Sequence, residues 1–388
     1  MDYILDYDKV LNILDNIKNL KKINSIKTRL GYEIPYYTYG KGQNHIVIVG
    51  GTHGSEIITV DFVLNLMDKI SNKKDEFKDL DENKYTFHFL PVQNPEGFII
   101  STSAIKTIID DNMSLDEIEK ICKEYYLKYR QDDIDSKENK DNKKIKLHQQ
   151  MFIQATYKCI PKKYEKIRES IKDMYNDTRL PKGSLICFRA NASGIELNRN
   201  TRYSKGIKDI KEKKSVYGLN RYNNIPTTIK GPIGIPCIDI NNFSYENENI
   251  LLYNLLEKLY NEKKYCGCLL FHSTGGEIYH KPIFESYENK LSNEEKEKIL
   301  NKNLELALEY QKYTGYNLTD NNDKEFNSFD GYMRTLYPNI LLIELSKMGG
   351  NPLGPYGDIK NNYIPTINDN LKATKNVIEL MAKSKTGI

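Results

Sequence analysis

The feature that most constrains the fold of this chain is a short apolar run that stops at two glycines. Residues 45–50 read HIVIVG and residues 86–92 read TFHFLPV, and such β-branched or aromatic runs ended by Gly or Pro predict two buried strands. Between them, apolar residues recur at spacings of three and four, which predicts an amphipathic helix: Ile58, Phe62, Val63, Leu66, Met67 and Ile70. A strand, a helix and a second strand in this order indicate a helix packed on a sheet.

The rest of the chain continues the alternation of helix and strand. Helical spacing predicts a covering helix over residues 5–20, another over 246–262, and a third that follows a capping box at residues 292–295. The runs CGCLLFHS (266–273) and ILLIELS (340–346) predict two more buried strands. Because no internal repeat is present, the alternation predicts one large α/β domain over residues 1–388.

Residues 102–182 differ in composition from the rest of the chain. Two helical patterns, at 114–130 and 162–175, flank the charged stretch QDDIDSKENKDNKKIK at 131–146, which has almost no apolar content. We interpret 102–182 as a charged helical insertion in the α/β domain, with a flexible and solvated middle.

Composition excludes several classes of protein. The net charge is only +4 and no basic patch stands out, so no nucleic-acid partner is expected. No window approaches 18 consecutive apolar residues, and the start MDYILDYDKV lacks the pattern of a signal peptide, so neither a membrane span nor secretion is expected. The sequence indicates no oligomeric state.

The six cysteines have no framework spacing, which indicates reduced thiols in a cytoplasmic protein. Two of them, Cys266 and Cys268, form a C-x-C pair inside a predicted strand. Strand alternation would place both on one packed face, so we expect core thiols rather than metal ligands.

The glycines at residues 50–54 precede a possible pair of metal ligands. His53 and Glu56 converge if the chain turns into a helix there, and imidazole and carboxylate are suitable zinc ligands. A catalytic zinc takes three protein ligands, and His272 ends another buried strand, where ligands collect in open α/β sheets. The other histidines are less suitably placed: His45, His88, His148 and His280. By pattern alone, a metal site and ordinary structural residues both stay possible.

Five short motifs in order resemble the zinc carboxypeptidase family, the metallocarboxypeptidases of the carboxypeptidase A type. They span residues from about 40 to 350 and read GTHGSE, NPEG, ANASGIELNRN, FHSTGG and LLIELS. The resemblance implies a mixed, mostly parallel, twisted sheet flanked by helices. It also implies one zinc ion per chain, bound by His53, Glu56 and His272.

The resemblance also implies catalytic roles. Glu344 in LLIELS matches the family's catalytic glutamate, a general base for a zinc-activated water; an ion pair at the strand end is the alternative. Arg189 matches the arginine that polarises the scissile carbonyl and stabilises the oxyanion, with a surface salt bridge as the alternative. Asn198 and Arg199 match the pair that binds the substrate's terminal carboxylate, and Arg202 is a competitor for either arginine role.

The substrate-facing tyrosine is harder to place. Tyr316 fits the pattern of bacterial relatives, while Tyr332 lies nearer to Glu344 in the sequence. Asp330 keeps the family's spacing of fourteen residues to Glu344, which places Phe329 at a position that lines the side-chain pocket. A phenylalanine there argues against a preference for C-terminal Lys or Arg.

The sequence departs from the family in two places. Glu96 replaces the aspartate of the N-P-D-G turn, and about 100 residues separate that turn from Asn198, which makes the 102–182 insertion this chain's own feature. The leading hypothesis is a zinc peptidase that cleaves an amide next to a free carboxylate, in a peptide C-terminus or a peptidoglycan stem peptide. The alternatives are a zinc deacylase of the aspartoacylase type on an N-acyl amino acid, and a non-catalytic binding protein with the same fold.

Overall fold

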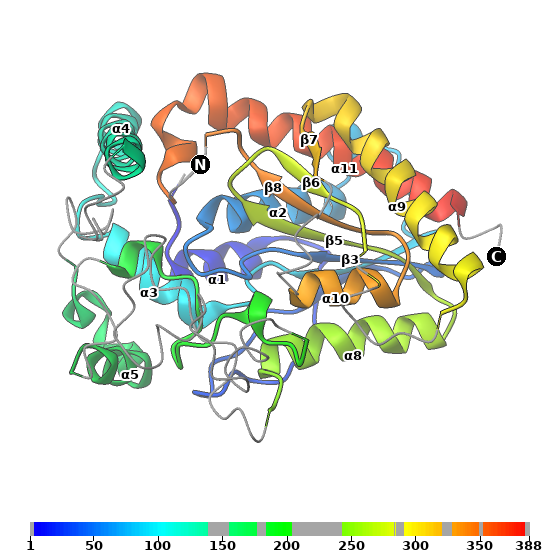
Figure 1. The fold of residues 1–388 in the computed structure, drawn as a ribbon, viewed down its shortest axis with the longest axis horizontal. Helices are drawn as coiled ribbons and strands as arrows, with labels where there is room; N and C mark the ends of the chain where they lie inside the picture. Colours follow the sequence, from blue (N-terminus) through cyan, green and yellow to red (C-terminus); the bar gives the residue numbers. More distant parts are fainter. Residues whose placement is uncertain are drawn as a thin grey trace.

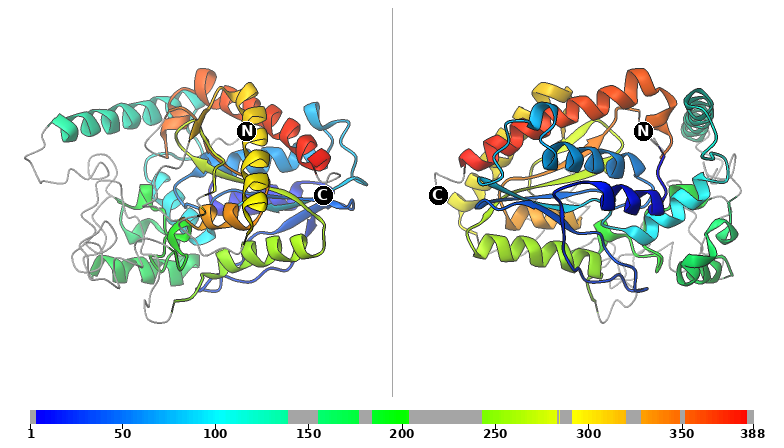
Figure 2. Two further views of the ribbon diagram at one scale, coloured as in Figure 1. Left: turned by 45° about the vertical axis from the view of Figure 1, so that its right-hand side comes forward. Right: turned by 180° about the vertical axis from the view of Figure 1, so that it is seen from behind.

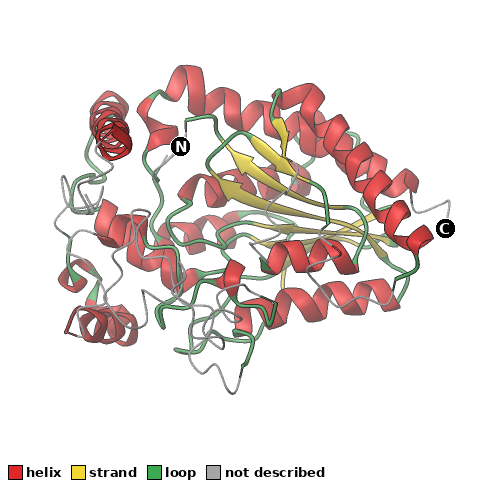
Figure 3. Ribbon diagram, in the orientation of Figure 1, coloured by secondary structure: helices red, strands yellow, loops and turns green. Residues whose placement is uncertain are grey.

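The computed structural model describes residues 4–138, 155–176, 184–203, 243–282, 284, 291–319, 328–348 and 352–384. In these residues, eight strands form one sheet in the order β1-β2-β4-β3-β5-β8-β6-β7, with helices on both faces (Figures 1 and 3). The strands are β1 (Lys21–Lys22), β2 (Tyr37–Gly40), β3 (Asn44–Val49), β4 (Tyr85–Leu90), β5 (Tyr265–Ser273), β6 (Glu277–Tyr279), β7 (Asn317–Thr319) and β8 (Ile340–Leu345).

The four central strands, β4, β3, β5 and β8, run parallel to one another. On one side, β2 and β1 add antiparallel pairings; on the other, β6 pairs antiparallel with β8 and parallel with β7. This confirms the predicted α/β class with a mixed, mostly parallel sheet. The carboxyl ends of the central strands therefore meet along one edge, where the predicted site residues lie.

Nine longer helices surround the sheet within the described ranges. They are α1 (Tyr7–Asn16), α2 (Ile57–Ser71), α3 (Pro95–Ile105), α4 (Leu115–Glu138), α5 (Glu165–Asn176), α8 (Asn247–Asn261), α9 (Asn293–Thr314), α10 (Phe329–Leu336) and α11 (Ile364–Ser384). Shorter helical turns are η1 (Asp75–Phe77), η2 (Tyr157–Cys159), η3 (Lys162–Tyr164), η4 (Ser184–Cys187), η5 (Leu197–Arg199), η7 (Gly354–Gly357) and η8 (Ile359–Tyr363). The capping box predicted at residues 292–295 is present at the start of α9.

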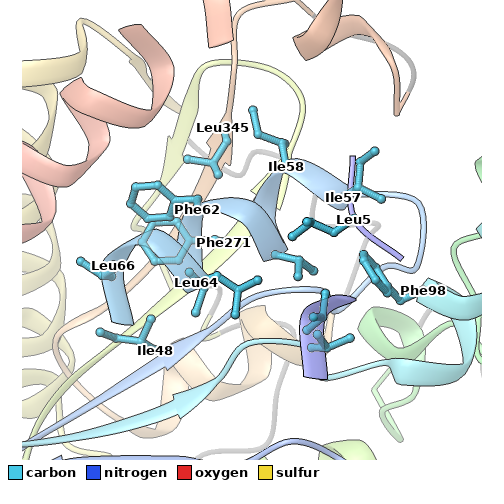
Figure 4. Packing of buried hydrophobic residues seen from close by; sticks show 14 of the residues in the cluster. Leu5, Ile48, Ile57, Ile58, Phe62, Leu64, Leu66, Phe98, Phe271 and Leu345 are labelled. Atoms are coloured by element: carbon cyan, nitrogen blue, oxygen red, sulfur yellow. The ribbon is translucent and has the colours of Figure 1, made fainter. Parts of the chain in front are cut away.

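Two apolar cores lie on opposite faces of the sheet. Figure 2 (right) shows the sheet between α11 (red) and α8 (yellow-green). The larger core, on the α2 and α11 face, includes Phe62 and Phe271, whose rings meet edge to face at 4.6 Å (Figure 4). The smaller core packs α8 and α10 against the other face. Ile46 and Val47 belong to different cores, so β3 is buried on both faces and its sequence shows an unbroken apolar run.

The prediction that Cys266 and Cys268 share one packed face is wrong. Cys266 belongs to the larger core and Cys268 to the smaller one. The register between β3 and β5 shifts at this point, because His45 pairs with Tyr265 while Ile46 pairs with Gly267. One extra residue in β5 reverses the alternation locally. Both thiols are buried and form no disulfide, as expected for core residues.

The predicted insertion is helical where the structure describes it. In Figure 1, α4 and α5 lie at the left, outside the sheet. The Glu119 carboxylate of α4 accepts the backbone N–H of Ile359, and Ser170 of α5 donates its hydroxyl to the Ala192 carbonyl. The first half of the charged stretch belongs to α4, and the rest lies outside the described residues. The division into a catalytic domain and an insertion stays a prediction.

No helix among the described residues is both long enough and apolar enough to cross a membrane.

The buried carboxyl group of Asp61 joins α2 to the C-terminal part of the chain. Asp61 is 3% exposed and accepts hydrogen bonds from the hydroxyls of Tyr356 (2.6 Å) and Tyr363 (3.2 Å). Burial raises the pKa of Asp61 to about 8, although the two hydroxyls oppose this rise. This helix starts directly after Glu56, so the contact also fixes the element that carries one predicted metal ligand.

Asp61 should therefore make stability depend on pH. The unfolded chain releases this proton above about pH 4, whereas the folded chain keeps it to about pH 8. The folded state binds more protons in between, so stability should fall as the pH rises. In Asp61→Asn, the free energy of unfolding should fall less steeply with pH than in the wild type, by up to about 1.4 kcal/mol per pH unit. Urea unfolding of variant and wild type between about pH 5 and about pH 7 measures this difference.

Asp68→Asn is the matched control on the same helix, because Asp68 lies at the surface beside Lys74. Parallel stability curves for Asp61→Asn and the wild type would mean that Asp61 is already ionised in the folded protein.

Candidate active site and metal centre

Three loops meet at the carboxyl ends of β3 and β4 because glycines let their backbones approach. A Cβ atom on Gly54 would lie 2.1 Å from the backbone carbon of Gly97, and one on Gly97 would lie 2.4 Å from the Ala190 carbonyl oxygen. The Asn94 side chain donates to the carbonyls of Thr52 (3.3 Å) and Arg189 (3.2 Å). Any side chain at these glycines would push the loops apart. The three motifs GTHGSE, NPEG and ANASG thus form one packed unit.

His53, Glu56 and His272 converge at this edge of the sheet. One possible ligand atom from each of them lies within 4.8 Å of the others, and all three residues are buried. His53 Nδ1 lies 2.7 Å from Glu56 Oε1, and His272 Nδ1 lies 3.2 Å from both His53 Nδ1 and Glu56 Oε2. The two Nδ1 atoms and the carboxylate therefore face one point.

A second layer of carboxylates fixes the two imidazole rings. Glu196 Oε1 lies 2.8 Å from His53 Nε2, and Asp330 Oδ2 lies 2.9 Å from His272 Nε2. A carboxylate on the outer nitrogen holds the tautomer that leaves Nδ1 with its lone pair towards the centre, as in metal sites whose ligands are oriented by outer partners. Two nitrogen donors and one oxygen donor, each held in this way, fit a catalytic zinc with three protein ligands.

Glu196 had no predicted role, and Asp330 was predicted only from its spacing to Glu344. Both are acids that the fold buries to 1% exposure, and such residues need a partner. The position of Glu196 inside the ELNRN motif was the signal available, but the partner of a buried acid cannot be read from a single sequence.

The charges of the cluster separate the roles of its carboxyl groups. Burial alone would raise the pKa values of Glu56 and Glu196, but the interactions of both with His53, of Glu56 with His272 and of Glu196 with the two arginines outweigh it and hold both pKa values below the usual range. These two groups stay ionised, as ligands and orienting partners must.

Glu344 lies beside the cluster with a different protonation behaviour. It stands opposite His272 in the parallel pairing of β5 and β8, so both side chains point to the same face of the sheet. Burial and the negative charge of Glu56 raise its pKa to about 7. A carboxyl group that titrates near neutral pH can both accept and release a proton there.

Two predicted arginines take different positions at the cluster. Arg189 reaches it directly, with Nη2 2.9 Å from His53 Nδ1 and Nη1 3.5 Å from Glu56 Oε1. Arg199 lies one layer out, with Nε 3.9 Å from Glu196 Oε2. Arg202 is exposed and lies over the ring of Phe243, at 5.9 Å from its centre.

Asn198 connects the ELNRN motif to α10. Its Oδ1 accepts the backbone N–H of Asp330 at 3.1 Å, and its carbonyl accepts from Arg199 Nη1 at 3.1 Å. Because Asp330 also holds His272, Asn198 and Arg199 are fixed relative to the metal cluster.

The contacts of Tyr316 do not support its predicted role of facing the substrate. Its side chain is 4% exposed, and its hydroxyl bonds with the Ser346 backbone N–H (3.1 Å) and Asn370 Nδ2 (2.9 Å). The hydroxyl therefore joins the end of β8 to α11 in the interior.

The other two predicted pocket residues lie on α10. Tyr332 is half-buried, with its ring 5.0 Å from that of Tyr203. Phe329 is 1% exposed and packs edge to face against Tyr245, so it belongs to the smaller core. Roles for either residue in substrate binding stay predictions.

The remaining histidines do not join the cluster in the described residues. His45 and His88 bond to each other at 2.8 Å between β3 and β4, and His280 lies beyond β6. His148 lies outside the described residues.

A mixed α/β sheet with two histidines and a glutamate gathered at its strand ends is typical of a metal-dependent hydrolase. The chain belongs to the zinc carboxypeptidase family, which it matches over residues 17–340. The resemblance inferred from the five motifs is thereby confirmed. Members of this family are metallopeptidases that use zinc.

Solved structures share the fold. Thrombin-activatable fibrinolysis inhibitor is 14% identical, with a TM-score of 0.53 over 97% of this chain and 73% of that one. Its bovine form, solved with tick carboxypeptidase inhibitor, is 15% identical, with a TM-score of 0.52 over 97% and 96%. Carboxypeptidase A from Helicoverpa armigera is 13% identical, with a TM-score of 0.53 over 98% and 74%. Among curated protein sequences, none is significantly similar.

The first site prediction concerns metal binding. Purified protein should bind about one zinc per chain, and His272→Ala should lose it, because two ligands and a weakened centre do not hold a catalytic zinc. Inductively coupled plasma mass spectrometry after dialysis measures the zinc content. His45→Asn is the control, because His45 lies at the opposite end of the sheet. Stoichiometric zinc with unchanged affinity in His272→Ala would remove His272 from the ligand set.

Proposed function

We propose that this chain is a zinc-dependent peptidase that hydrolyses the amide bond next to a free carboxylate. The observation that carries the proposal is the position of Glu344, opposite His272 on the neighbouring strand, with a pKa near neutrality. Family membership supports the same conclusion. A non-catalytic protein would have no need for a carboxyl group tuned in this way beside three metal ligands.

The metal would be held by His53 Nδ1, His272 Nδ1 and the Glu56 carboxylate, one ion per chain. When bound, zinc supplies a Lewis acid that polarises a carbonyl and makes a water molecule more acidic. Glu196 and Asp330 keep the two imidazoles oriented throughout.

The protein's own groups bind the substrate and move the protons. Arg199 and Asn198 bind the terminal carboxylate, for which the planar guanidinium is well suited. Arg189 donates to the carbonyl oxygen as negative charge develops there. The Glu344 carboxylate takes a proton from the attacking water and passes it to the leaving amine nitrogen. Both proton transfers need a group with a pKa near the working pH, as Glu344 has.

The substrate is a peptide with a free C-terminal carboxylate or a peptidoglycan stem peptide. The described cysteines form no disulfide with one another, which supports a reducing compartment such as the cytoplasm. A deacylase of the aspartoacylase type would act on small N-acyl amino acids instead, and a hydrolysis assay with both substrate classes discriminates the two.

The first functional prediction concerns the substrate carboxylate. Arg199→Ala should lower kcat/KM for a free-acid peptide by roughly 2–5 kcal/mol in transition-state stabilisation, the cost of removing one partner of a desolvated ion pair. The C-terminal amide of the same peptide should lose much less. Arg202→Ala is the matched control, because this arginine is exposed and lies over Phe243. Equal losses on acid and amide would exclude Arg199 from carboxylate binding.

The second functional prediction concerns the proton acceptor. Glu344→Gln keeps the size of the side chain but cannot accept a proton, so kcat should fall by about two to four orders of magnitude. Zinc content should stay at the wild-type value, since Glu344 is not a ligand in this proposal. Steady-state kinetics and metal analysis on the same preparation measure both quantities.

Glu379→Gln is the control for Glu344→Gln, because Glu379 pairs with Lys375 at the surface of α11. Loss of zinc from Glu344→Gln would make this residue part of the metal site. Full activity would mean that another group takes the proton.

A further inference from the structure

A second carboxylate stands next to Glu344 on the same face of the sheet. In the antiparallel pairing of β6 and β8, Glu277 is the direct partner of Glu344. Side chains of directly opposed residues in such a pair share one face, with Cβ atoms about 5 Å apart. His272 is the partner of Glu344 on its other side. Across three neighbouring strands, His272, Glu344 and Glu277 therefore form a row.

The packing around Gly275 supports this placement. A Cβ atom built on Gly275 would lie 3.5 Å from both Glu277 Cγ and Glu344 Cβ. The Tyr279 hydroxyl donates to Glu277 Oε2 at 2.7 Å and holds that carboxylate in position. Burial and the hydrogen bond to Glu277 raise the pKa of Tyr279, the negative charges of Glu277 and Glu344 raise it further, and the Arg334 guanidinium opposes the rise.

Glu277 has no cationic partner among the described residues. It is half-buried, and its interaction there is the hydrogen bond from Tyr279. The side chain of Lys347 covers Gly276, but its ammonium group lies over the ring of Tyr316, 5.9 Å from the ring centre. The buried Arg334 guanidinium acts on Tyr279 but forms no ion pair with Glu277. A partly buried carboxylate without an ion pair is costly, and a cation from a ligand would offset that cost.

The strand order sets the direction in which a substrate would cross the site. Arg199 lies near Glu196, the partner of His53 in the loop after β3. Asn198 bonds with Asp330, the partner of His272 on β5. Strands β8 and then β6 follow on the far side of β5. A substrate with its carboxylate at Arg199 and its amide at the metal cluster therefore extends its amino-terminal part past Glu344 towards Glu277.

We propose that Glu277 binds an ammonium group in the part of the substrate that lies amino-terminal to the cleaved bond. The inference rests on the proposed peptidase function and specifies its substrate class. An ammonium there has two sources, the free α-amine of a short peptide or the side-chain amine of a lysine-like residue. Both would donate to the carboxylate in the same way.

Two matched pairs of substrates with the same C-terminal residue test the proposal and separate the two sources. Alanyl and N-acetyl-alanyl peptides differ in the α-amine, and N-acetyl-lysyl and N-acetyl-norleucyl peptides differ in the side-chain amine. Zinc-loaded Glu277→Gln should lose about tenfold or more in kcat/KM on the ammonium-bearing member of at least one pair, and little on its neutral partner. The pair that responds identifies the source. Glu277→Asp should retain part of the preference, because it keeps the charge.

Equal losses on all four peptides would assign Glu277 a structural role and overturn the proposal, as would no loss on any. Calorimetric binding to zinc-loaded Glu344→Gln protein, with and without Glu277→Gln, gives a readout that does not need turnover. There the ammonium-bearing peptide should bind about tenfold more tightly than its neutral partner only while Glu277 is present. If wild type hydrolyses none of the peptides, the proposed function fails, and the binding preference still tests Glu277 separately.

Discussion

The site depends on two buried imidazole–carboxylate contacts, Glu196 with His53 and Asp330 with His272. They fix which nitrogen of each ring faces the centre. They also join three parts of the chain that share no strand pairing: the edge of the sheet, the loop that carries Asn198 and Arg199, and α10. The same two carboxylates therefore set the geometry of the three possible metal ligands and their position relative to Asn198 and Arg199.

The acidic side chains of this site differ in pKa because of their surroundings, not because of their residue type. Glu56 and Glu196 face imidazoles and stay ionised, while Glu344 is partly buried beside the negative Glu56 and has a pKa of about 7. Carboxyl groups whose surroundings push their pKa values apart take on different chemical roles. The sequence shows three glutamates, but the different surroundings that suit them to the proposed roles of ligand, orienting partner and proton acceptor arise only in the folded chain.

The strands, the helix after His53 and the three possible metal ligands could be predicted, because each leaves a local mark in the sequence. Apolar runs predict β3, β5 and β8, and glycines mark the turn at residues 50–54. Long-range partners leave no such mark. Tyr316 matched a motif, yet its hydroxyl is bound to Asn370, 54 residues away, and the bulge in β5 that separates Cys266 from Cys268 exists only in the register with β3.

The row of side chains across the sheet gives the site opposite charges at its two ends. Arg199 stands on the side of the loop after β3, and Glu277 stands on β6, with the metal cluster and Glu344 between them. A short peptide has the same separation of charge, since its carboxylate and its amine lie on either side of the amide that is cleaved. Where the ammonium is the α-amine, a site that binds both ends can reject longer or blocked chains through the unpaired charge that they would leave on Glu277. Complementary charges at the two ends of the site would then set both the direction in which the substrate binds and its length.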